Sequence, residues 1–196
     1  MNIMLPPPAA HPPASERACA IAARFGLDAA RSAARESAVP LRPGTIVLIT
    51  GPSGGGKSPL LRAIAQTPEC PPARWLDGAG RPRRHRRSVV ESFHQPLRIL
   101  LPGLCRAGLS EPRLWLRKPD ELSAGEYFRF QLARWYAGRM PLLLADEFAS
   151  VLDRTTAKVI AQQLRRFVDH SRHSRRPRLA VLATAHDDLS DDLRPD

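Results

Sequence analysis

Thr45–Ser58, with the sequence TIVLITGPSGGGKS, decides the fold of this chain. Its first part, Thr45–Thr50, is short, apolar and rich in β-branched residues, which predicts a buried strand of a parallel sheet. Its second part, Gly51–Ser58, fits the pattern G-x-x-x-x-G-K-[ST], in which a strand passes through a glycine-rich turn into a helix. This strand context favours a phosphate-binding loop over a surface turn with a chance lysine.

The residue types of this loop suit a nucleoside triphosphate. Glycines let backbone N–H groups curl around an anion, because side chains at those positions would obstruct it. Lys57 is expected to reach the β- and γ-phosphates, and the Ser58 hydroxyl is expected to hold Mg²⁺. The helix that opens there points its positive end at the same phosphates, and Pro59 is tolerated in its first turn. The predicted nucleotide-binding residues of this segment are Gly51, Pro52, Ser53, Gly54, Gly55, Gly56, Lys57, Ser58 and Pro59.

Two acidic residues, Asp146 and Glu147, directly follow the apolar run 142–145. A carboxylate at the end of a buried strand costs several kcal/mol unless a counter-charge lies beside it. In P-loop enzymes that counter-charge is Mg²⁺ with its nucleotide, so Asp146 is the predicted metal ligand. Glu147 is the predicted catalytic residue that orients or deprotonates the attacking water. The alternative is a strand that merely ends in surface acids.

The segment 122–126, LSAGE, precedes this strand. Ser123 and Glu126 fit the S-x-x-E capping box, which predicts that a helix starts there. The box leaves Gly125 unexplained, because glycine weakens a first turn by about 0.5–1 kcal/mol relative to alanine. A glycine at this position indicates that something must approach the backbone closely.

Five segments of the chain resemble, in order, the motifs of ABC-type ATPases: GPSGGGKS, LSAGE, LLLADE, SVLD and ATAHDD. LSAGE is similar to the signature motif, usually LSGGQ, and the segment 150–153 is similar to the D-loop. Asp153 is also placed to cap the next helix. His186 resembles the switch histidine that touches the γ-phosphate. The match covers about residues 40–190, and five motifs in order are more specific than any one of them.

This resemblance implies an assembly. Two such domains pack head to tail around two ATP molecules, and each P-loop faces the signature of the other subunit. Ser123 and Gly125 would then contact the γ-phosphate in trans, beside the D-loop acid Asp153. The resemblance implies ATP and Mg²⁺ as cofactors and Lys57, Glu147 and His186 as the catalytic residues. ATP would join a homodimer, or a dimer with a paralogue, and hydrolysis would release it.

The chain also departs from the family pattern. The usual proline after the paired acids is Phe148, and the interval from Lys57 to Ser123 is shorter than in transporter ATPases, where that region docks on membrane partners. Gln95 is the candidate for the Q-loop glutamine, with a polar loop residue as the alternative. Phe25 either stacks on adenine or packs in a core.

Alternating apolar strands and amphipathic helices predict an α/β fold. The resemblance makes this a P-loop NTPase fold of ABC-ATPase type, a mostly parallel sheet flanked by helices with a reduced helical subdomain at about 95–138. Residues 1–14, rich in proline, are expected to be a disordered tail, and 15–196 a single domain. Besides 45–50, the expected strands are 89–93, 142–145 and 179–183. The expected helices begin at 58, 97, 123 and 155.

Composition limits the choice of partners. A net charge of +11 suggests an anionic partner such as nucleic acid, and Arg81–Arg87 is either a solvated loop or a contact to a phosphate backbone. Only three of the 30 basic residues are lysine, which indicates base-composition bias instead. The three cysteines show no zinc or disulfide spacing. No bilayer-length apolar stretch and no secretion signal is seen, which predicts a cytoplasmic protein without membrane insertion.

The first interpretation is therefore a soluble ABC-type ATPase that hydrolyses ATP with Mg²⁺, dimerises on ATP binding and has an unknown protein partner. The alternatives are a transporter subunit, a DNA-associated ATPase and a nucleotide-binding module without turnover. The segments at 122–135, 146–159 and 183–196 resemble stand-alone bacterial members, some of which accompany GNAT acetyltransferase domains. Such relatives continue beyond Asp196, so a short or truncated member is expected.

Overall fold

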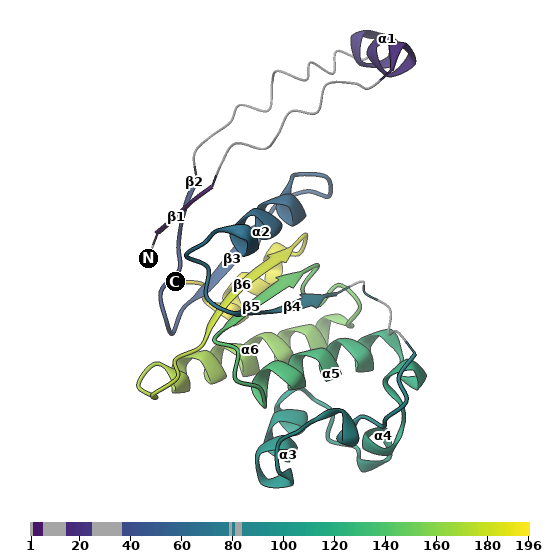
Figure 1. Ribbon diagram of the computed structural model, residues 1–196, viewed down its shortest axis with the longest axis vertical. Coiled ribbons are helices and arrows are strands. Elements are labelled where there is room, and N and C mark those ends of the chain that lie inside the picture. Colours follow the sequence, from purple (N-terminus) through teal and green to yellow (C-terminus); the bar gives the residue numbers. More distant parts are fainter. Residues whose placement is uncertain (1, 6–14, 25–36, 79, 81–83) are drawn as a thin grey trace.

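A four-stranded parallel sheet forms the centre of the molecule (Figure 1). The computed structural model describes residues 2–5, 15–24, 37–78, 80 and 84–196. The strands run in the order β3-β6-β5-β4, and their bounds are Ile46–Thr50 for β3, Ala73–Asp77 for β4, Leu142–Asp146 for β5 and Leu179–Thr184 for β6. The expected α/β fold with a parallel sheet flanked by helices is confirmed.

Helices cover both faces of this sheet (Figure 1). Helix α2 packs on one face, and α5 and α6 pack on the other. The α-helices are α1 (Glu16–Arg24), α2 (Lys57–Gln66), α3 (Leu97–Arg106), α4 (Pro112–Leu116), α5 (Ala124–Tyr136), α6 (Arg154–Ser171) and α7 (Ser190–Leu193). Three 3₁₀ turns are η1 (Val90–Ser92), η2 (Pro119–Glu121) and η3 (Asp187–Leu189).

The alternation of side chains along β5 explains its unbroken apolar run. Leu142 and Leu144 pack with Leu61 of α2, whereas Leu143 and Ala145 belong to the larger core with α5 and α6. Successive residues of a strand point to opposite faces, so a strand covered on both sides is apolar throughout. Its carboxyl end is therefore where a polar residue first appears, at Asp146.

The observed elements differ from the sequence-based expectations in three places. Val89–Phe93 is not a strand: Glu91 accepts hydrogen bonds from the backbone N and the hydroxyl of Ser88 (2.8 and 2.7 Å), which closes the turn η1. At the start of the expected tail, β1 (Asn2–Leu5) precedes the prolines and pairs antiparallel with β2 (Ser37–Pro40), a strand pair that was not foreseen. The edge strand β4 was not foreseen, because only one of its side chains is fully buried. The rest of the tail, Phe25 and Arg81–Arg83 lie outside the described residues.

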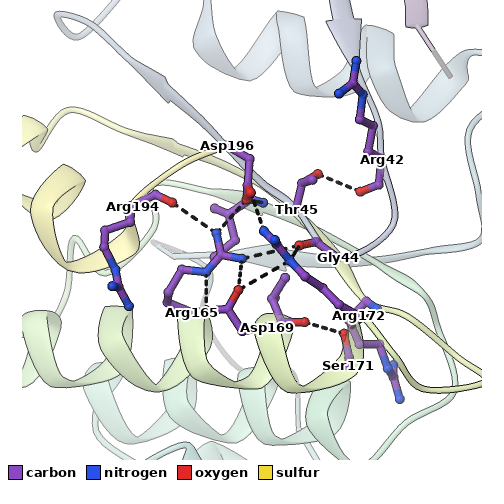
Figure 2. Close-up of polar contacts among 12 residues, drawn as sticks. Arg42, Gly44, Thr45, Arg165, Asp169, Ser171, Arg172, Arg194 and Asp196 are labelled. Carbon is purple, nitrogen blue, oxygen red and sulfur yellow. Dashed lines mark hydrogen bonds and ion pairs between the residues drawn. The ribbon is translucent and has the colours of Figure 1, made fainter.

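A polar cluster fastens α6 to the start of β3 (Figure 2). Arg165, only 3% exposed, donates to Asp169 and to Asp196, both at 2.6 Å. Asp196 also accepts from the backbone N of Ile46 at 3.0 Å. Burial tends to raise the pKa of the Asp196 carboxyl, but the hydrogen bonds from Arg165 and from the backbone of Ile46, together with the charges of Arg165 and Arg172, hold that pKa below its usual value. The cluster compensates a buried guanidinium.

None of the described helices combines the length and the apolar character needed to cross a bilayer.

Candidate nucleotide-binding site

The glycine-rich loop joins β3 to α2 and carries left-handed backbone at two glycines. Gly54 has φ 79° and Gly56, the N-cap of α2, has φ 84°, a region that residues with a Cβ rarely adopt. The Nζ atom of Lys57 donates to the carbonyl oxygens of Gly51 at 2.7 Å and of Pro52 at 2.8 Å. The ammonium group therefore lies within the turn, next to the positive end of α2.

Ser58 and Asp146 connect this loop to the end of β5. The Ser58 hydroxyl donates to Oδ1 of Asp146 at 3.0 Å, across 88 residues of sequence. A hydroxyl and a carboxylate are hard oxygen ligands of the kind Mg²⁺ accepts, and Mg²⁺ usually needs few protein ligands because water and phosphates supply the others. Within the described residues no cluster of three His, Cys, Asp or Glu side chains is placed to hold a metal. The pair therefore fits Mg²⁺ bound together with a nucleotide.

The turn after β5 has unusual backbone geometry. Glu147 has φ 48° and Ala149 has φ 61°, both left-handed although neither is glycine. Such residues cost of order 1–3 kcal/mol and persist only where the surroundings hold them. Phe148 lies between them, fully buried, and its backbone N donates to the carbonyl of Ala183 in β6 at 2.8 Å. A proline at position 148 could not make this hydrogen bond, because proline has no N–H to donate.

Phe148 also connects the paired acids to the helix that follows the signature-like segment. Its ring meets that of Phe128 in α5 edge to face, with centroids 5.6 Å apart. Both rings are at most 1% exposed. Edge-to-face pairs add about 0.5–1.5 kcal/mol beyond the area they bury. The turn that carries Glu147 is therefore packed directly against α5.

Gly78 is a further residue of the site that sequence reasoning missed. Its backbone N donates to the carbonyl of Asp146 at 2.8 Å, and a Cβ placed on it would lie 2.0 Å from the carbonyl oxygen of Glu147. A side chain there would force the backbone of the paired acids to move. The sequence before it, ARWLD, carries charged residues and no clear strand pattern, so Gly78 is recognisable only once β4 has been identified.

The loop, the paired acids and His186 line one pocket of about 430 Å³. It is lined by Ser53, Gly54, Gly56, Lys57, Ser58, Pro59, Asp146, Glu147, Ser150, Ala185 and His186. Apart from Ser150 and Ala185, these are residues that the sequence predicted. The backbone N of His186 donates to the Thr184 hydroxyl at 3.1 Å, which fixes the turn that follows β6. The structure thus brings the segments that follow β3, β5 and β6 to one cavity.

The signature-like segment lies elsewhere. Ser123 is exposed at the N-terminus of α5, where it accepts from Glu126 N at 3.3 Å while the Glu126 carboxylate accepts from Ser123 N at 2.8 Å. The predicted capping box is confirmed. A Cβ on Gly125 would lie 3.1 Å from Leu152 Cδ2 and 3.4 Å from the carbonyl of Val151. The close approach expected at Gly125 is therefore made, at least in part, by the chain's own D-loop-like segment.

Asp153 caps α6, as the sequence predicted. It accepts a hydrogen bond from the backbone N of Thr156 at 2.9 Å. Hydrogen bonds from Thr156 lower the pKa of the Asp153 carboxyl. Neither Asp153 nor Ser123 nor Gly125 lines the 430 Å³ pocket. Gln95, the Q-loop candidate, lines a different cavity.

Comparison with known proteins agrees with this geometry. No family model matches the chain. The lipoprotein-releasing system ATP-binding protein LolD of Maricaulis maris is 34% identical over 161 residues, covering 64% of this chain and 69% of that protein. The LolD protein of Gluconobacter oxydans is 32% identical over 185 residues, with 76% and 77% covered. The Fe(3+) ions import ATP-binding protein FbpC 3 of Rhodococcus jostii is 33% identical, and 46% of its length is spanned.

Solved structures show the same fold. The dimeric post-hydrolysis state of the ATP-binding cassette MJ0796 bound to ADP and Pi superposes with a TM-score of 0.61 at 20% identity, covering 81% of this chain and 82% of that one. An inward-facing metal-chelate type ABC transporter gives a TM-score of 0.62, also at 20% identity, with 82% and 71% covered. At this identity the likeness establishes the fold of an ATP-binding cassette.

Proposed function

Because this chain belongs to the family of ABC-type ATP-binding proteins, which are ATPases, we propose that it binds ATP with Mg²⁺, hydrolyses it and works as a head-to-tail dimer. The single observation that carries the proposal is the contact between Ser58 and Asp146 at 3.0 Å, with Glu147 lining the same pocket. It unites a phosphate loop, a metal pair and a candidate base.

In this proposal the chain's own residues position the phosphates and Mg²⁺ and activate the attacking water. Backbone N–H groups of the loop and the Lys57 ammonium would hold the phosphates, and Ser58 and Asp146 would hold Mg²⁺. Mg²⁺ bound there would neutralise charge on the β- and γ-phosphate oxygens. Glu147 takes a proton from the attacking water, whose oxygen bonds to the γ-phosphorus while the bond to the ADP oxygen breaks. His186 is proposed to contact the γ-phosphate from the turn after β6.

A second copy would complete the site. Ser123 and Gly125 do not line the pocket of their own chain, and Ser123 is exposed on α5. A head-to-tail partner would bring these residues, with its D-loop acid Asp153, to the γ-phosphate. The solved cassettes of MJ0796 are themselves dimeric. We propose that the partner is a second copy of this chain.

The Lys57→Ala variant tests the proposed ATP binding and hydrolysis. Removing the ammonium group should weaken binding of a fluorescent ATP analogue at least tenfold and abolish phosphate release. Lys158→Ala, at an exposed position on α6, is the matched control and should behave as the parent chain does. Equal ATP affinity in Lys57→Ala and the parent would overturn the assignment of the loop.

A second candidate function is that of the ATP-binding subunit of a membrane transporter. The relatives are named for lipoprotein release and Fe(3+) import. On this chain, α3 exposes Leu97 (59%) and Ile99 (47%), in the region after Gln95. Leu97→Asp/Ile99→Asp should then release the protein from the membrane fraction of its host, while ATP hydrolysis by the purified chain stays intact. Unchanged fractionation of the double variant would count against this candidate.

Three further predictions made from the sequence stay predictions. A stand-alone role, a cytoplasmic location and an association with an acetyltransferase domain are not needed by the geometry above. Nucleic-acid binding is not carried forward, because neither the site nor the relatives named above point to it.

A further inference from the structure

A second pocket lies at the opposite end of the strands from the nucleotide pocket. It has a volume of about 160 Å³ and lies between Arg74 of β4, the loop at Gln95 and Arg134 near the end of α5. Arg74 pairs with Leu143 in the sheet, near the start of β5, whereas Asp146 ends that strand. The two pockets are therefore separate cavities, at the two ends of β5.

Positive charge is concentrated in this second pocket. Arg74, Arg134 and Arg139 line it together, and the first two are only partly exposed. Burial lowers the pKa of both partly buried guanidinium groups, and the charge of Arg134 lowers that of Arg74 further. Among the described residues, none of the three forms an ion pair with a carboxylate. Like charges gathered without a counter-ion are costly to bury.

A fourth arginine, Arg178, lies next to the pocket and adds to its positive charge. Arg178, 9% exposed, donates to the carbonyls of Met140 and Gly138, both at 2.6 Å. These two residues line the pocket. Burial lowers the pKa of Arg178 as well, and the charge of Arg176 lowers it further. This contrasts with Arg165, whose buried charge is balanced by Asp169 and Asp196.

The geometry points to a binding site for a phosphate-type oxyanion, formed by Arg74, Arg134 and Arg139. Guanidinium groups pair with phosphate in a planar, two-pronged manner, and a small anion suits a pocket of about 160 Å³. His94 and Gln95 line the same pocket and carry further side-chain donors. The group is either inorganic phosphate or a phosphate monoester on a larger molecule. The site is independent of the nucleotide pocket and of its proposed reaction.

Titration calorimetry on the full chain tests this site. Lys57→Ala serves as the background, so that the glycine-rich loop competes less for the probe. Inorganic phosphate and glycerol phosphate are titrated separately, which distinguishes the free ion from a monoester. We expect binding of at least one probe with a stoichiometry near one. Arg74→Gln/Arg134→Gln should weaken it at least tenfold.

A charge-matched control separates a site from general attraction. Arg113→Gln/Arg166→Gln removes two exposed arginines on α4 and α6 and should leave the affinity within about twofold. If the pocket variant is poorly folded, Arg139→Gln, at an exposed position, replaces it and should still weaken binding severalfold. Equal loss in control and pocket variants, or no binding of either probe, overturns the proposal. Binding of an acidic peptide alone would instead assign the pocket to a protein partner.

Discussion

The glycine-rich loop lines a pocket, whereas the signature-like segment lies exposed at the start of a helix. The loop is joined to the paired acids through Ser58 and Asp146 and opens into a cavity of about 430 Å³ with His186. The segment at Ser123 lies on the outside of α5, and its polar groups cap their own helix. One chain thus gathers the glycine-rich loop and the paired acids around one pocket, whereas Ser123 and Gly125 do not line that pocket.

This difference indicates how the two regions are linked. Phe148 of the paired-acid turn packs on Phe128 of α5, and Leu152 approaches Gly125. A shift at Glu147 would therefore reach the helix that carries Ser123 through direct contact. The following predictions separate the two regions, from the largest expected effect to the smallest.

Replacing the proposed base should affect the loop region alone. In Glu147→Gln the carboxylate that takes the proton is lost while size and backbone are kept, so kcat should fall about 10²–10⁴-fold. ATP affinity should stay within a few-fold of the parent. Phosphate release and equilibrium ATP binding, measured in parallel, check this. Glu69→Gln, at an exposed position, is the control. Unchanged turnover in Glu147→Gln would remove Glu147 as the base.

Replacing the signature serine should affect assembly without affecting the loop. Ser123→Arg places a long, charged side chain where the second copy would contact ATP, so the ATP-dependent dimer should be lost. ATP binding to the single chain should persist, because Ser123 does not line that pocket. Sedimentation with and without ATP measures the change, with Ser174→Arg on an exposed loop as control. A dimer that survives in Ser123→Arg would argue against the trans arrangement.

The aromatic contact between the two regions should be measurable as a coupling. Phe148→Ala removes a fully buried ring and should lower the free energy of unfolding by about 3–5 kcal/mol. Phe148→Leu should cost less, because it keeps apolar contact with α5. A double-mutant cycle with Phe128→Ala should give a coupling of about 0.5–1.5 kcal/mol. Chemical denaturation of the four proteins supplies the values. If the losses of unfolding free energy in the two single variants simply add up in the double variant, Phe148 and Phe128 are not coupled.

The Gly125→Ala substitution should have the smallest effect on stability. Gly125→Ala improves helix propensity by about 0.5–1 kcal/mol, but its Cβ would lie 3.1 Å from the movable end of Leu152. Stability should therefore change by less than about 1 kcal/mol. If a second copy also approaches this backbone, the ATP-dependent dimer should weaken several-fold at unchanged stability. Unaltered dimerisation would mean that the glycine serves only the packing of its own chain.

Most of the nucleotide-binding half could be predicted from the sequence, because its chemistry is local. The strand, the glycine turn and Lys57 are contiguous, and Asp146 follows a run whose burial on both faces makes it apolar. The capping roles of Ser123 and Asp153 are also encoded within four residues.

The parts that escaped prediction depend on contacts distant in sequence. The strand β4 is at the sheet edge, so its residues carry a weak pattern, and Gly78 matters only because the backbone of Glu147 lies against it. Val89 and Val90 suggested a strand, but hydrogen bonds between Ser88 and Glu91 favour a turn. The arginine pocket joins β4 to the end of α5, which no local pattern could indicate.

Cross-linking between the two regions tests the central claim most directly. Cysteines are placed at Ser53 of the loop in one copy and at Ala124 beside the signature serine in another, both exposed positions, in a Glu147→Gln background in which Cys19, Cys70 and Cys105 are replaced by serine. A short thiol-reactive linker should join the two chains when ATP and Mg²⁺ are present, and far less with ADP. Failure to cross-link with ATP, in a variant shown to bind ATP, would contradict a site shared between two copies.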